Sequence, residues 1–127
     1  MPNPHYTQVV RHVAGVEAKR AVVNAASAAA AGNVLVAEVP GKRICVLAAC
    51  LIAAGDVAAT FYSGPADVGM ALSGPLPLGA NGGFAIDAPL DANLAWLRNE
   101  PGESLVLHLG AAVQVGGLLV YFEEDAE

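Results

Sequence analysis

Turn-forming residues interrupt the apolar sequence at short intervals, and this spacing limits the possible folds more than any other feature. Gly, Pro, Asn and Asp separate short apolar segments about every eight to twelve residues. Such spacing is typical of the strands of a β-sandwich or a β-barrel. The sequence therefore predicts an all-β fold, which we expect to be an antiparallel β-sandwich.

Three segments carry the clearest strand patterns. In Ser104–Leu109 the leucines alternate with Ser, Val and His, so they share one face of a strand. Val57–Ser63 is rich in residues that favour strands, including two aromatic residues. The closing segment, Val113–Phe122, contains Gly116-Gly117, and paired glycines in a strand predict a β-bulge.

Turn chemistry predicts how these segments connect. Pro presets φ and Gly tolerates positive φ, so Pro40-Gly41 predicts a tight hairpin between Val34–Val39 and Arg43–Ala53. Asn81-Gly82 is a favoured two-residue hairpin signal, and Pro101-Gly102 predicts a further turn.

The Gly-rich stretch FYSGPADVGMALSGPLPLGANGGF, residues 61–84, raises the question of a ligand-binding loop. It lacks the Lys-Ser/Thr ending of a phosphate loop, and its prolines remove N–H donors that a phosphate cradle would use. We interpret the stretch as the corners of a sheet.

Ala21–Ala31 departs from the strand pattern. Its alanines favour a helix, with Gly32-Asn33 as a C-cap, but an isolated helix of that length is marginal in water. We favour a strand or extended structure, and the helix remains the alternative.

The two ends of the chain differ from its centre. Residues 1–15 are interpreted as an extended arm, or alternatively as a disordered tail; residues 16–122 as the sandwich domain; and residues 123–127 as a frayed acidic tail. The arm supplies the candidate contacts to a protein partner or to a neighbouring subunit, which are Tyr6, Gln8, Val10, Arg11 and His12.

The composition predicts association with other protein. A chain of 127 residues is most simply one domain, and its 55% hydrophobic and 14% charged residues make it unusually apolar. No apolar run approaches the roughly 20 residues of a membrane helix, and the N-terminus has no signal-peptide pattern. We expect an oligomer and no membrane partner. The net charge of −6, with scattered basic residues, predicts no nucleic-acid partner.

Cys45 and Cys50 are the two cysteines. Residues five apart on a regular strand face opposite sides and lie roughly 16 Å apart, which is too far for a disulfide. We expect two buried free thiols, which fits assembly in a reducing compartment.

No catalytic, metal or cofactor motif stands out. The three histidines lack zinc-like spacing, and no serine lies in a nucleophile elbow. Asp87 and Asp91 are interpreted as turn-formers, with paired catalytic carboxylates as the minor alternative. Trp96 is interpreted as a core or interface anchor, with a sugar platform as the alternative. We expect no enzyme activity and no cofactor.

Residues from about Ala26 to Tyr121 resemble the small decoration (cement, or auxiliary) proteins on the capsids of tailed bacteriophages. The similar pieces occur in order and are NVLVAEVPGKRICVL, TFYSG, ALSGPLPLGANGG, PGESLVLHL and VGGLLVY. At Asn99-Glu100-Pro101-Gly102 the chain departs from that pattern, because such sequences often carry Thr before the Gly-Glu step, and we expect a different corner there.

The resemblance implies a jelly-roll-like sandwich without catalysis that binds the major capsid protein as an oligomer, with a trimer favoured over a dimer. It implies assembly in the host cytoplasm and a place on the capsid exterior. The positions implied as structural turns are Gly41, Gly64, Gly74, Asn81, Gly82 and Gly102.

Two other functions remain open at this point. One is a head-fibre base or a tail-associated adhesion module, since one architecture hosts several functions. The other is a carbohydrate- or small-ligand-binding sandwich that uses Trp96 and loop carboxylates.

Overall fold

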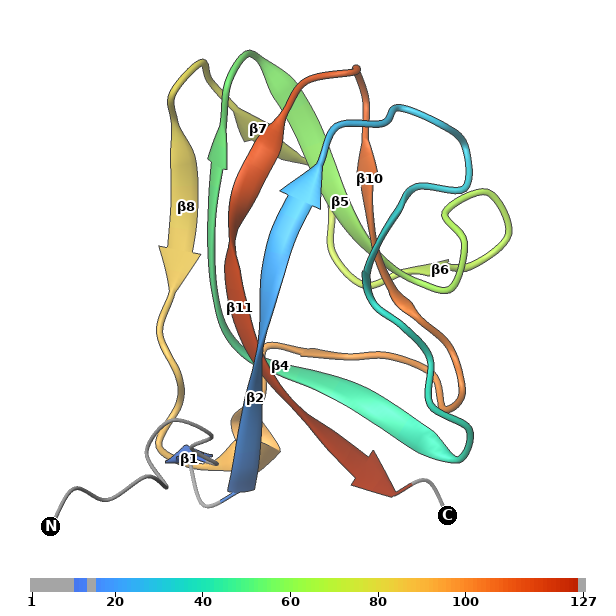
Figure 1. Cartoon of the computed structure of the whole chain (residues 1–127), viewed down its shortest axis with the longest axis vertical. Coiled ribbons are helices and arrows are strands. Elements are labelled where there is room, and N and C mark those ends of the chain that lie inside the picture. Colours follow the sequence, from blue (N-terminus) through green and yellow to red (C-terminus); the bar gives the residue numbers. More distant parts are fainter. Residues whose placement is uncertain (1–10, 14–15, 126–127) are drawn as a thin grey trace, which may run out of the picture.

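Two antiparallel sheets make up the computed structural model, which describes residues 11–13 and 16–125 (Figure 1). The first sheet has the strand order β1-β2-β11-β4-β8, and β9 also pairs with β4. Its strands are β1 (Arg11–Val13), β2 (Val16–Ala25), β11 (Val115–Asp125), β4 (Lys42–Ala53), β8 (Gly83–Ile86) and β9 (Leu97–Arg98).

The second sheet has the order β3-β10-β5-β6, with β7 also paired to β5. Its strands are β3 (Asn33–Val36), β10 (Leu105–Leu109), β5 (Val57–Ser63), β6 (Met70–Ala71) and β7 (Leu76–Leu78). A short 3-10 helix, Ala92–Leu94, precedes β9. In Figure 1, β8, β4, β11 and β2 lie side by side, and β5 and β10 lie to their right.

The chain changes sheets at most of its connections, which is the jelly-roll arrangement. Strands β2, β4, β8 and β11 belong to the first sheet, whereas β3, β5, β7 and β10 belong to the second. In a jelly roll, two Greek keys place strands that are distant in sequence side by side. The prediction of an all-β, antiparallel, jelly-roll-like sandwich is confirmed.

The core lies between the sheets and follows the predicted alternation. Leu105, Leu107 and Leu109 of β10 are buried in the main hydrophobic cluster, together with inward side chains of both sheets. Strand β5 has the predicted bounds, and its Phe61 meets Phe84 of β8 edge to face, with ring centroids 6.5 Å apart. This contact joins the two sheets, because β5 and β8 belong to different ones.

Both predicted hairpins are wrong, although both turns form. At Pro40-Gly41 the Lys42 N–H donates to Val39 O over 3.0 Å, and Gly41 has a φ of 75°. The strands on either side nevertheless join different sheets, β3 pairing with β10 and β4 with β11. A turn reverses the chain locally, but its chemistry does not determine which sheet the next strand joins.

At Asn81-Gly82 the turn likewise connects β7 of the second sheet to β8 of the first. Asn81, with a φ of 61°, takes the left-handed conformation, and the Gly82 N–H donates to Gly79 O over 2.8 Å. The Ala53 N–H in turn donates to Gly82 O, which fastens this corner to the end of β4.

The predicted bulge at Gly116-Gly117 is also wrong. The register of β11 against β4 is regular there and shifts between Val120 and Tyr121, which pair with Ala48 and Val46. Leu47 is therefore the extra residue, on β4, and two consecutive residues of a bulge point to the same face. Gly117 instead allows β11 to lie close to β4, because a Cβ at this position would overlap the carbonyl oxygen of Cys50.

The bulge corrects the expectation for the cysteines. On one side of Leu47, Cys45 packs in an outer cluster with Ala18 and Phe122; on the other, Cys50 is opposite Leu118 on the same outer face. Both thiols are free, but Cys45 is buried and Cys50 is exposed. The rule of alternating faces failed because the extra residue reverses the parity of the strand.

The interpretation of a frayed acidic tail is wrong for Glu123, Glu124 and Asp125, which continue β11 alongside β4. Each carboxylate meets a basic side chain of another strand, in the pairs Lys19–Glu123 at 3.1 Å, Arg98–Glu124 at 2.7 Å and Lys42–Asp125 at 2.5 Å. Residues 126 and 127 lie outside the described residues.

For Ala21–Ala31 the strand or extended alternative is confirmed. Strand β2 runs to Ala25, and the chain then continues without helix to β3. Gly32 has a φ of 86° and donates to Ala29 O, which closes a turn before β3. Pairing of β2 with β11 outweighs the weak helical preference of the alanines.

The corner at Asn99 joins both sheets. Asn99 is 2% exposed; its Oδ1 accepts from the Ile44 N–H over 2.7 Å, and its Nδ2 donates to Glu103 O over 2.6 Å. The hydroxyl of buried Ser63, on β5, accepts from the Glu100 N–H and donates to Glu103 Oε1. This corner therefore ties β4 of one sheet to β5 of the other.

We expect Asn99→Ala to lower the free energy of unfolding by about 2–3 kcal/mol, because the buried Ile44 N–H and Glu103 C=O lose their partner. Urea denaturation measures the change. Asn93→Ala, at an exposed position of the 3-10 helix, is the control and should change stability by no more than about 0.5 kcal/mol. Equal effects of the two substitutions would contradict this role of Asn99.

The adjacent glycines Gly116 and Gly117 of β11 test how closely β11 and β4 must pack. Gly117→Ala should destabilise the fold by about 3 kcal/mol, because the new methyl group overlaps the Cys50 carbonyl of the neighbouring strand. At Gly116 the nearest atom to a new Cβ is Val23 O at 3.8 Å, an ordinary contact, so Gly116→Ala should be tolerated. Thermal denaturation of both variants compares them, and a stable Gly117→Ala protein would show that the strands can separate at low cost.

Candidate functional site

An exposed apolar surface lies on the outer side of the first sheet. It comprises Val22 on β2, Leu118 on β11, and Cys50 and Ile52 on β4, and we call these four residues the outer apolar face. Leu118 is directly opposite both Val22 and Cys50 across the strands. Val22 is 71% exposed, Ile52 55% and Leu118 45%, and the face carries no charged side chain. Such a patch is typical of a surface that contacts other protein.

Small residues leave a shallow hollow beside this face. Gly116 is opposite Ile52, and a hollow of about 380 Å³ opens there. Its rim is polar but uncharged, since Gln114 Nε2 donates to Asn24 Oδ1 over 2.7 Å. The residues that line the hollow are Cys50, Ile52, Ala53, Ala54, Asn81, Gln114, Gly116 and Gly117.

The fold covers the other half of the same outer surface with its own chain. A second cluster of Ala18, Cys45, Leu47 and Phe122 packs against Val16, Val120 and Ala95. Ala95 belongs to the segment between β8 and β9, and the next residue, Trp96, donates its backbone N–H to Val46 O over 2.9 Å. Covered and uncovered halves therefore form one continuous outer surface.

The segment between β8 and β9 also presents apolar side chains to solvent, among them Leu90, Leu94 and Trp96. Trp96 is half-exposed, so it is not a core anchor, and its Nε1 donates to Asp87 O over 2.7 Å. Asp91 acts as the predicted turn-former, because its Oδ1 accepts from the Asn93 N–H over 2.9 Å.

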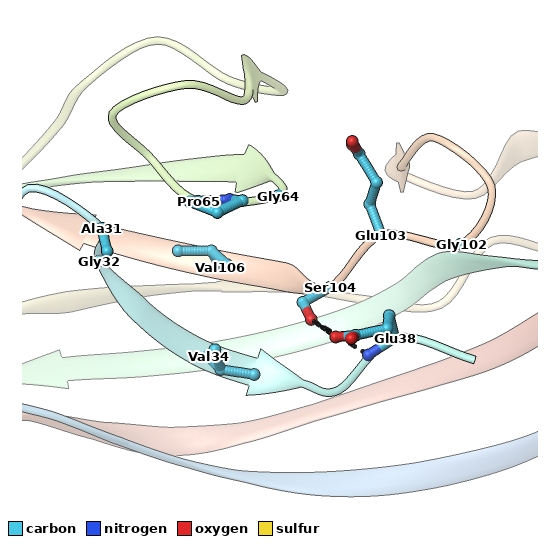
Figure 2. A pocket seen from close by; sticks show the side chains of 10 residues that line it. All are labelled: Ala31, Gly32, Val34, Glu38, Gly64, Pro65, Gly102, Glu103, Ser104 and Val106. Atoms are coloured by element: carbon cyan, nitrogen blue, oxygen red, sulfur yellow. Dashed lines mark hydrogen bonds between the residues drawn. The ribbon is translucent and has the colours of Figure 1, made fainter. Parts of the chain in front are cut away.

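A second hollow, of about 390 Å³, lies over the second sheet (Figure 2). Its lining is Ala31, Gly32, Val34, Glu38, Gly64, Pro65, Gly102, Glu103, Ser104 and Val106, and we call it the acidic hollow. The two carboxylates in it extend in different directions in Figure 2.

Serine hydroxyls already bind both carboxylates of the acidic hollow. Ser104 donates to Glu38, and this hydrogen bond lowers the pKa of the Glu38 carboxyl below its ordinary value. Glu103 accepts from Ser63 Oγ over 2.7 Å. Both carboxylates of the hollow therefore already accept a hydrogen bond from within the chain. The lining of the hollow includes no basic side chain.

Nucleophilic chemistry has little support at Cys45. Burial raises the pKa of the Cys45 thiol to about 11, although Arg98 lies 3.7 Å from its Sγ. A thiol with so high a pKa is almost entirely protonated at neutral pH and is a poor nucleophile.

Among residues 11–13 and 16–125, no group of three or more His, Cys, Asp or Glu side chains could hold a metal ion. In the part of the chain that the structure describes, no helix is long and apolar enough to cross a membrane.

The six turn positions are spread over several corners of the sandwich. Gly41, Gly64, Asn81 and Gly102 have positive φ, whereas Gly74 and Gly82 do not. Of the six, Gly64 and Gly102 line the acidic hollow, and none of the others is brought next to them in it.

The arm positions are placed only in part. Tyr6, Gln8 and Val10 lie outside the described residues. Arg11 and His12 form part of β1, which pairs with β2 at the edge of the first sheet, Arg11 opposite Ala18 and His12 opposite Glu17.

Sequence reasoning missed the outer apolar face, although a signal was present. Successive side chains of a strand point to opposite faces, so consecutive apolar residues such as Val22-Val23 and Leu118-Leu119 place apolar side chains on both. The Ser63–Glu103 and Glu38–Ser104 pairs had no such signal, because their members are far apart in the sequence.

Comparison with protein families, with curated proteins and with solved structures found no match for this chain.

The two thiols should react at very different rates. In dilute native protein at pH 8, we expect iodoacetamide to modify exposed Cys50, whereas Cys45 stays unmodified until denaturant is added. With a pKa of about 11, only about one Cys45 thiol in a thousand is ionised at that pH. Mass spectrometry measures the modification, and a Cys50→Ala variant that is labelled rapidly in the native state would contradict the burial of Cys45.

Proposed function

We propose that this chain is a non-enzymatic structural protein of a virion, which binds the outside of a tailed-phage capsid lattice as a homo-oligomer and stabilises the lattice. The observation that carries the proposal is the outer apolar face, an exposed and uncharged surface on a jelly-roll sandwich. A surface of this kind suits contact with protein better than contact with a small polar molecule. Such a face supports the homo-oligomer, and the ordered resemblance to decoration proteins supplies the lattice partner, the major capsid protein.

Mass action explains how such binding stabilises a shell. A protein that binds the assembled lattice and not its separated subunits shifts the equilibrium toward the assembled state. An oligomer that engages several neighbouring sites at once gains effective affinity without strong individual contacts.

The N-terminal arm fits attachment to the lattice itself. Extended segments can add a strand to the exposed edge of a partner sheet, where main-chain hydrogen bonds supply affinity. We propose that residues Tyr6–Val13 act in this way on the capsid, with Tyr6, Gln8, Val10, Arg11 and His12 as the contacts. The described part of the segment, β1, already pairs as an edge strand in its own sheet, so its residues are compatible with β-pairing.

The carbohydrate-binding alternative has less support. The Trp96 indole N–H already donates to a backbone carbonyl, and Glu38 and Glu103 already accept from serines. A head-fibre base or an adhesion module would use the same sandwich, and only its position on the particle separates it from a decoration protein.

Virus particles from the phage that encodes this chain test the proposal. We expect the chain on the capsid exterior at a regular stoichiometry, which cryo-electron microscopy and quantitative mass spectrometry measure. Particles that contain it only in fibres or tails would favour the alternative virion role, and its absence from the particles would contradict the proposal.

The same particles test the arm. Stripped capsids are incubated with the full chain or with a variant that lacks residues 1–13, and bound protein is counted after sedimentation. We expect lower occupancy for the truncated chain, whose thermal denaturation serves as the control for folding. Equal occupancy by the full chain and the truncated variant would show that the arm does not contribute to binding of the lattice.

A further inference from the structure

We infer that the outer apolar face is a two-fold interface, on which a second copy of this chain packs sheet against sheet. The inference rests on the proposed function only in that both require a homo-oligomer, and it specifies the surface and the symmetry. A two-fold interface uses the same patch on both subunits, so the patch must be complementary to itself.

Cross-strand pairing arranges the outer side chains in rows that run across four strands. One row consists of Val22, Leu118, Cys50 and Ala85, each directly opposite the next. The neighbouring row contains Asn24, Gly116, Ile52 and Gly83 in the same strand order. Both rows point outward, because the residues between them, such as Val23 and Leu51, are buried in the core.

A two-fold axis parallel to the strands, between β11 and β4, lays β11 of one copy over β4 of the other. Leu118 then meets Cys50 of the second copy, and Ile52 meets Gly116 beside the hollow. Each large side chain faces a small one, so the two surfaces can interdigitate as the facing sheets of a sandwich do. The same operation lays Val22 of β2 over Ala85 of β8.

Charge at the margins of the face has the same symmetry. The next row contains Arg20, Val120 and Ala48, in register. Asp87 directly follows Ile86, the last residue of β8, which pairs with Ala49, so Asp87 lies near the opposite end of that row from Arg20. The two-fold axis brings Arg20 of each copy toward Asp87 of the other, which gives two opposite-charge pairs at the rim.

These features favour a second copy over an unrelated partner. The chain has a net charge of −6, so two copies repel each other over most of their surfaces. The outer apolar face is uncharged, and its two charged flanks are of opposite sign and matched by the symmetry. An apolar centre with a polar rim, here including Asn24 and Gln114, is the usual anatomy of a protein interface.

Sedimentation velocity over a range of concentrations, combined with charge exchange, tests the interface. We expect the wild-type chain to form dimers. Arg20→Asp and Asp87→Arg should each weaken dimerisation about tenfold, because each places like charges together. The double variant, Arg20→Asp with Asp87→Arg, should restore dimerisation to within about twofold of wild type, since the pairs are re-formed with reversed sign. Loss without such restoration would overturn the inference.

A matched pair of exposed substitutions separates this face from the other sheet. Ile52→Lys should abolish the dimer, because it places a charge at the centre of the apolar contact. Val34→Lys, at a similarly exposed apolar residue on β3 of the second sheet, should leave the dimer intact. Circular dichroism of both variants checks the fold.

A wild-type monomer, or a trimer such as the resemblance implies, would overturn the two-fold interface. The outcomes also separate this inference from the proposed function. A trimer that still decorates capsids removes the two-fold interface and keeps the proposed function, whereas a dimer that is absent from virus particles keeps the interface and removes the function.

Discussion

The pairing of β4 with β11 determines the character of the outer sheet. The two strands stay in register from one end of β11 to the other except at Leu47, the one extra residue of β4. On one side of this bulge the outward residues of β4 include Leu47 and Cys45; on the other they include Cys50 and Ile52. The core-facing residues on both sides remain apolar and buried. A single inserted residue thus keeps the core intact while it changes which side chains reach the outer surface.

The two halves of that surface have different properties. Toward the end of β11, Glu124 pairs with Arg98 on this surface, and the chain's own segment before β9 packs against the apolar cluster. Exposed ion pairs of this kind contribute little to stability, so their main effect is to leave this end of the sheet charged. Toward the start of β11 the surface is uncharged and uncovered. A partner that needs an apolar contact can therefore bind only the half of this outer surface that contains the outer apolar face.

Local patterns predicted some elements closely and others wrongly, for identifiable reasons. The alternation in Ser104–Leu109 correctly predicted the buried leucines of β10, because side-chain alternation is a local property of a strand. The composition of Val57–Ser63 correctly predicted β5. The Pro40-Gly41 and Asn81-Gly82 turns formed, but the hairpins did not, because the partners of β4 and β8 lie elsewhere in the sequence. The acidic end of the chain was interpreted as a tail because its basic partners come from three other strands.

By itself, the sequence determined the all-β class, the positions of the main strands and the places where the chain turns. These properties depend on neighbouring residues: the two-residue period of a strand and the φ preferences of Gly, Pro and Asn. Only the tertiary structure decided which sheet each strand joins, where the bulge lies, and which apolar residues stay exposed. Those depend on pairing between strands far apart in the chain, as when Leu118 lies between Val22 and Cys50, and no local pattern specifies such partners.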